Sequence, residues 1–207
     1  MKMQISREFV ERAIGPTVWD FGNSVLYDLC KNHPRHDQDS TIIAKIWLIG
    51  RSYAAAIERR LNVAKMPVGD GFYEDNVAPT VRASKIDAWF DSITETVSTE
   101  KYLEIHAKVT KLFSDISGMQ KRSLASKYLH FHFPQHFYIF DSRACNALRQ
   151  LAKPVRRRHA GQYDRDYAAF CSRCESLNDQ VARLLGRRLT PRELDKVLLT
   201  LTGREDR

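Results

Sequence analysis

Long apolar runs are missing from this chain of 207 residues. The longest apolar stretch, residues 41–49, is interrupted by Lys45, so no segment approaches the roughly 18 apolar residues that cross a membrane. The N-terminus mixes charges with Ile5, Phe9 and Val10 and lacks the apolar centre of a secretory signal. We therefore expect no membrane partner and a cytoplasmic location.

Cysteine is scarce. Cys30, Cys145, Cys171 and Cys174 cannot form a dense disulfide framework in a chain this long, which fits a reducing compartment. Cys171 and Cys174 make one CxxC, but no second Cys or His pair stands at the spacing of a zinc site. Because residues 163–175 are predicted to be helical, both cysteines are interpreted as packing residues, and no metal or cofactor is expected.

Strand patterns are also rare, and residues 137–140 are the best candidate. Apolar residues instead recur at three- and four-residue steps in nearly every segment, as in residues 17–32. The composition, 43% hydrophobic and 28% charged, is that of a globular protein, and the length suits one core. The sequence predicts a single compact all-α domain over residues 1–207, with few or no strands.

Turn residues divide this domain. Further helices are predicted over residues 39–61, 81–96, 98–114, 122–131, 142–151 and 190–201. Pro67, Gly69, Gly71 and Pro79 predict a long loop over residues 63–80. A second predicted loop, residues 153–161, is rich in arginine.

Acidic residues are outnumbered: 33 Lys and Arg face 25 Asp and Glu, for a formal charge of +8. This balance favours a polyanionic partner, DNA or else RNA, over a basic surface with no partner. Arg156, Arg157 and Arg158 in the basic loop would attract phosphates without sequence preference.

The informative stretch is residues 116–144. A tight turn at Gly118 joins two predicted helices, and a loop with an aromatic run then delivers Asp141 to the start of helix 142–151. Asp141 has two interpretations. It is a helix cap, which its position favours, or a carboxylate tuned by apolar neighbours and directed at a cleft.

This layout resembles the helix-hairpin-helix DNA glycosylases, which include the 8-oxoguanine glycosylases and endonuclease III-like enzymes. Their hairpin reads L-P-G-V-G-x-K-x-A, and residues 116–120, ISGMQ, occupy its first five positions. Ala125 is similar to the family alanine, one residue late, and residues 141–143, DSR, are similar to the family D-T-H. The hairpin and catalytic segment would span about residues 112–151, in an all-helical setting that agrees with the family.

The sequence departs from the family at two points. Gln120 replaces the second glycine, and the lysine of the lyase-competent members corresponds to Ser123, or to Arg122 if the extra residue falls between. Lys127 lies one helical turn after Ser123 on the same face. The resemblance implies that Asp141 is the catalytic carboxylate and that Lys127 is the candidate nucleophile, against the alternative of an exposed helix lysine.

The resemblance also implies contacts to DNA. The backbone contacts would be Gly118, Gln120, Lys121, Arg122 and Arg143, and the base pocket would contain Phe131, His132 and Tyr138. The four-cysteine iron–sulfur pattern of some members of the family is absent.

Three histidines, His130, His132 and His136, stand close together. Residues two apart on a helix do not share a face, and Pro134 breaks the helix before the third. We interpret them as packing or nucleotide-contacting residues rather than metal ligands.

The predicted function is that of a DNA glycosylase, with or without AP-lyase activity, which extrudes a modified or damaged base and cuts its glycosidic bond. It would act as a monomer in repair or in defence against foreign DNA. The alternatives are a non-catalytic helical DNA- or RNA-binding module and a structural or partner-binding helical protein. An enzyme should place Asp141 in an open cleft near Lys127, whereas a binding module can bury it as a cap.

Overall fold

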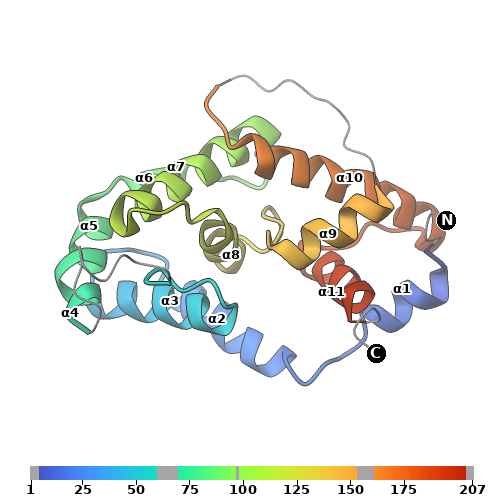
Figure 1. Ribbon diagram of the computed structural model, residues 1–207, viewed down its shortest axis with the longest axis horizontal. Helices are drawn as coiled ribbons and strands as arrows, with labels where there is room; N and C mark the ends of the chain where they lie inside the picture. The colour runs from blue at the N-terminus through green and yellow to red at the C-terminus, as the bar shows by residue number, and fades with distance from the viewer. Residues whose placement is uncertain (1–4, 60–69, 97, 153–160, 204–207) are drawn as a thin grey trace.

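The computed structural model describes residues 5–59, 70–96, 98–152 and 161–203, and every regular element within them is helical (Figure 1). The elements are α1 (Arg7–Ala13), α2 (Asp20–Asn32), α3 (Asp39–Ser52), α4 (Asp70–Phe72), the π-helical turn η1 (Tyr73–Val77), α5 (Ala78–Ala83), α6 (Ile86–Asp91), α7 (Thr99–Ser117), α8 (Arg122–His132), α9 (Ser142–Leu151), α10 (Arg165–Leu185) and α11 (Pro191–Thr202). The predicted all-α fold is confirmed. None of the helices in these ranges has the length and apolar character needed to cross a membrane.

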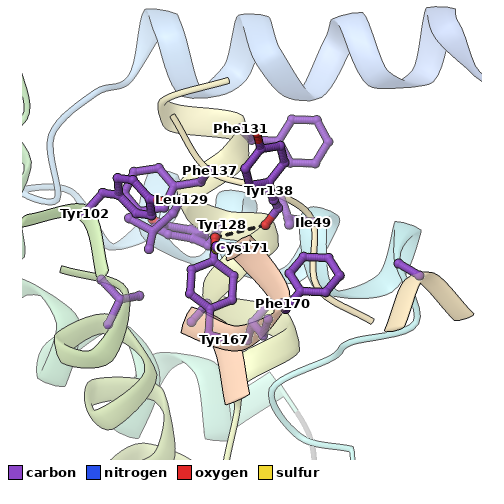
Figure 2. Close-up of a cluster of buried hydrophobic side chains, with 14 of the residues drawn as sticks. Ile49, Tyr102, Tyr128, Leu129, Phe131, Phe137, Tyr138, Tyr167, Phe170 and Cys171 are labelled. Carbon is purple, nitrogen blue, oxygen red and sulfur yellow. Dashed lines mark hydrogen bonds between the residues drawn. The ribbon is translucent and has the colours of Figure 1, made fainter. Parts of the chain in front are cut away.

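Helix α8 lies at the centre of the molecule (Figure 1). It packs against α2, α3 and α7, and α9 packs against α10 and α11. Tyr128, Leu129 and Phe131 of α8 are almost fully buried. Figure 2 shows this core, in which the Tyr167 hydroxyl of α10 donates to the Tyr138 carbonyl at 3.0 Å. Neighbouring helices therefore enclose the central helix.

Local hydrogen bonds set several of the predicted boundaries. The Ser98 side chain caps α7, and Thr190 and Glu193 form a reciprocal capping box at the start of α11. Gly118 ends α7 in the left-handed conformation, with φ of 67°, as a glycine turn requires. The prediction of two helices joined by a glycine turn is thus confirmed.

The predicted helix over residues 39–61 is wrong at its end, because α3 stops at Ser52. Ala54 adopts a positive φ of 50°, which the helix cannot accommodate. The chain turns back so closely that a Cβ on Gly50 would lie 3.0 Å from the Cα of Ala56. This close crossing brings residues 53–59 beside the first turn of α8, where they form part of the candidate site.

Two other boundaries differ from expectation. Residues 70–80, predicted as part of a loop, are helical, because Pro79 falls in the first turn of α5, where a missing N–H costs nothing. The predicted helix 81–96 is two helices, since Ser84 is extended between α5 and α6. The strand proposed for residues 137–140 does not form, and this segment runs between α8 and α9 without a pairing partner. The arginine-rich positions 153–160 lie outside the described residues.

Candidate active site

A pocket of about 600 Å³ lies where segments from different parts of the chain meet, with Leu199 of α11 among its lining residues. Its walls come from the hairpin turn, the first turns of α8, the start of α9 and the segment after α3. The lining residues are Tyr53, Ala54, Ala55, Ala56, Arg59, Met119, Gln120, Lys121, Ser123, Leu124, Lys127, Phe140, Asp141, Ser142, Arg143 and Leu199. Both residues predicted to be catalytic line this one pocket.

Hydrogen bonds from α8 hold the chain that carries Asp141. The Phe140 amide donates to Ser126 Oγ at 3.0 Å, and Lys127 Nζ donates to the Phe140 carbonyl at 3.3 Å. Asp141 itself is the N-cap of α9, where its Oδ1 accepts from the Ala144 amide at 2.8 Å. Its side chain nevertheless keeps 26% of its exposure. Asp141 can therefore be both a helix cap and a carboxylate directed at the pocket. Its Oδ1 caps α9, and its Oδ2 is left to interact with groups in the pocket.

Lys127 is buried, with 1% exposure, and is not an exposed helix lysine. Its Nζ lies 2.7 Å from Ser123 Oγ and 3.9 Å from Asp141 Oδ2. Burial lowers the pKa of this lysine, and the charge of Asp141 opposes that shift. The amine is thus easier to deprotonate than a surface lysine, yet it remains close to a carboxylate.

The hairpin turn forms another wall of the pocket. Gly118, Met119 and Gln120 are exposed, and nothing lies within 4 Å of the position that a Cβ on Gly118 would take. Lys121 is different, because it is buried and its Nζ donates to the carbonyl of Arg59 at 3.0 Å. Lys121 therefore ties the hairpin to the segment after α3.

Cations dominate the polar lining. Arg59 and Arg143 are exposed at the pocket, and Lys121 and Lys127 are buried beside it, against the single carboxylate of Asp141 among the described lining residues. Such an arrangement attracts a polyanion and favours phosphates near the pocket entrance.

Arg122 is turned away from this pocket. Its Nε lies 2.6 Å from Asp164 Oδ2, its Nη2 lies 2.9 Å from Asp166 Oδ2, and its guanidinium packs over the Phe140 ring at 5.3 Å. These contacts anchor α8 to α10. The expected phosphate contact at Arg122 has no support from its position.

The three residues expected to form a base pocket do not come together at the candidate site. Phe131 and His132 line a second pocket, of about 630 Å³, and Tyr138 lines a third, where its hydroxyl donates to Glu175. The helical repeat accounts for the separation of Phe131, which lies one turn beyond Lys127.

His130 has a packing role. His130 is fully buried, with Nδ1 2.8 Å from the Phe137 carbonyl and Nε2 2.6 Å from the Tyr27 hydroxyl. The neutral ring satisfies both contacts, donating from Nδ1 and accepting at Nε2. Within the described ranges, no group of three or more His, Cys, Asp or Glu residues is placed to hold a metal ion.

Several polar pocket residues were not predicted as site residues, among them Ser123, Tyr53 and Arg59. Ser123, four residues before Lys127, had a detectable signal in its helical spacing. Tyr53 and Arg59 had none, since they follow a helix whose end was wrongly predicted and reach the pocket only through the fold.

Comparison with protein-family models, curated proteins and solved structures gives no match for this chain.

Proposed function

We propose that this protein is a DNA glycosylase with AP-lyase activity, which removes a modified or damaged base after extruding it from the duplex. One observation carries the proposal: a buried amine and a partly exposed carboxylate lie 3.9 Å apart in an electropositive pocket, at the end of a glycine-turn hairpin. Both groups lie on the segment that resembles the helix-hairpin-helix glycosylases.

The carboxylate suits the bond that breaks. Cleavage of a glycosidic bond builds positive charge on the sugar, and a fixed anion beside that charge lowers the barrier. The Asp141 carboxylate is such an anion, and Oδ2 presents its charge. Its other oxygen, Oδ1, accepts from the Ala144 amide of α9, and Lys127 of α8 donates to the carbonyl of the preceding residue, so the carboxylate is held in place. No rearrangement is needed to present the charge.

The amine suits the covalent step. Neutral Lys127 attacks the sugar carbon C1′, and the electron pair of the broken C–N bond leaves with the base, which takes up a proton. Loss of a proton from the new C–N linkage opens the sugar ring and yields a Schiff base, from which elimination cleaves the strand. Ser123 Oγ, at 2.7 Å from Nζ, orients the amine toward the pocket.

A trapping experiment tests the proposal. The protein is incubated with duplexes carrying a panel of modified bases, and borohydride reduces any Schiff base to a stable protein–DNA crosslink. We expect base release and crosslinking from the wild type and neither from Lys127→Gln. Lys121→Gln is the matched control, because Lys121 lines the same pocket but is bonded to main-chain carbonyls.

Three outcomes would change the assignment. Base release without crosslinking means that water, and not Lys127, attacks the sugar. Crosslinking that survives in Lys127→Gln and disappears in Lys121→Gln moves the nucleophile to Lys121. DNA binding without release of any base from the panel supports the non-catalytic binding module.

A further inference from the structure

The active-site pocket and the second pocket lie along the same two helices. On α8, Lys127 lines the active-site pocket, and Phe131, four residues later, lines the second. On α11, Leu199 lines the active-site pocket and Arg192 the second. Residues three or four apart on a helix share a face, so Asp195, between Arg192 and Leu199, lies on the face of α11 that borders the partition between the pockets, although it lines neither pocket.

Asp195 is a charged side chain at a core position. It is 3% exposed and follows the buried Leu194 on α11. Its Oδ2 accepts a hydrogen bond from Arg192 Nη1 at 2.6 Å, but its buried Oδ1 has no hydrogen-bond partner among the described residues. A buried acceptor without a donor costs free energy, and such groups are rare unless a ligand completes them.

Aromatic rings form the partition beside this carboxylate. Tyr53 lies with its ring 5.9 Å from Lys127 Nζ and packs edge-on against Phe131 at 5.4 Å. Phe131 in turn packs against Tyr27 at 4.7 Å. A flat heterocycle whose sugar lies at Lys127 would extend along α8 toward Phe131, about 6 Å away along the helix axis.

The ionisation state of Asp195 defines what it can bind. Burial raises its pKa to about 6, with the charge of Asp141 adding to the shift and that of Arg192 opposing it. At neutral pH the group is therefore mainly a carboxylate, which accepts hydrogen bonds and donates none.

We propose that Asp195 recognises the extruded base, by accepting at Oδ1 a hydrogen bond from an exocyclic amino group of that base. The inference rests on the proposed function and narrows its substrate class to amino-bearing bases, with Tyr53 of the active-site pocket contacting the ring. A base that presents only carbonyl oxygens at the edge facing Asp195 is rejected, because two hydrogen-bond acceptors would then face each other.

Binding of uncleavable duplexes tests this role. A 2′-fluoro sugar disfavours positive charge and blocks bond breakage, so affinity can be measured apart from chemistry. The probes are two pairs that differ in one amino group: 5-hydroxymethylcytosine with 5-hydroxymethyluracil, and 2-aminopurine with purine. We expect the wild type to bind an amino-bearing member about tenfold more tightly than its partner, in line with one good hydrogen bond.

Variants of Asp195 identify the recognising group. Asp195→Asn should lose or invert the preference, because an amide can donate to a carbonyl, and Asp195→Leu should lose it. Asp179→Asn, an exposed carboxylate on α10, is the matched control and should keep it. Both Asp195 variants remove a buried charge and should fold, which thermal melting checks.

The outcomes separate the two proposals. Equal wild-type affinity for both members of each pair, or equal weakening of both by Asp195→Asn, overturns the role of Asp195. Discrimination in binding without base release from the cleavable duplexes contradicts only the glycosylase chemistry. Absence of any DNA binding contradicts both.

Discussion

The two carboxylate oxygens of Asp141 have different surroundings. Oδ1 caps α9 and Oδ2 lies 3.9 Å from Lys127 Nζ. Asn is itself a good cap, so Asp141→Asn should change the free energy of unfolding by less than about 1 kcal/mol. Base release should fall by about 10²- to 10³-fold, because the charge that stabilises the sugar cation is lost.

The matched control for this prediction is another capping aspartate. Asp164 caps α10 and pairs with Arg122, outside the pocket. Asp164→Asn should lower stability while base release stays near the wild-type rate. Single-turnover assays and urea unfolding of both variants are the measurements, and equal losses of activity would show that Asp141 acts only as a cap.

Buried histidines predict how stability depends on pH. Burial lowers the pKa of His36 and of His130 to about 4, below the ordinary histidine value of 6.5. Between pH 4 and pH 6.5 the unfolded chain therefore binds more protons at these two histidines than the folded chain does. The contribution of the two neutral rings to the free energy of unfolding is thus complete above pH 6.5 and is lost as pH falls toward 4. Asp195, whose pKa is raised, acts in the opposite direction and offsets part of the loss.

The expected size of this effect follows from the shifts. Each of the two histidines should cost about 2 kcal/mol of unfolding free energy at about pH 5 relative to about pH 7. Urea unfolding at the two pH values measures the difference. A protein equally stable at both would mean that these rings are protonated in the folded state.

At the scale of elements, the hairpin depends on one glycine. Gly118 has φ of 67° with open space around it, so Gly118→Ala is strained by backbone conformation alone and should cost about 1 kcal/mol. Gly22, inside α2 and equally open, is the control, and Gly22→Ala should stabilise by about 0.5–1 kcal/mol. Thermal melts of both variants check the pair, and opposite signs are the expected result.

Most helices were predictable because their signals are local. Capping at Ser98 and Thr190, the glycine at the end of α7 and the apolar spacing all involve residues within four positions. The end of α3 was not predictable, because a close crossing of Gly50 and Ala56 stops the helix. Packing overrode helix propensity there.

At the scale of the whole molecule, the excess of cations should make DNA binding depend on salt. Removal of one cation that binds a phosphate should reduce the slope of log K against log salt by about 0.9. Replacing Arg59 and Arg143 together with Ser should therefore flatten the slope by about 2. Arg187 pairs with Glu193 outside the pocket, so Arg187→Ser should leave the slope unchanged. Fluorescence anisotropy across a salt series measures the slope for each variant.

The sequence by itself determined the helical class, most helix boundaries, and the placement of Lys127 and Asp141 on neighbouring elements. These features follow from backbone hydrogen bonds and side-chain spacing over a few residues. Only the tertiary structure decided that Tyr53 and Arg59 join these two residues in one pocket, and that Phe131 and Tyr138 line separate pockets. Such contacts join positions far apart in the chain, and they depend on how the helices pack around α8.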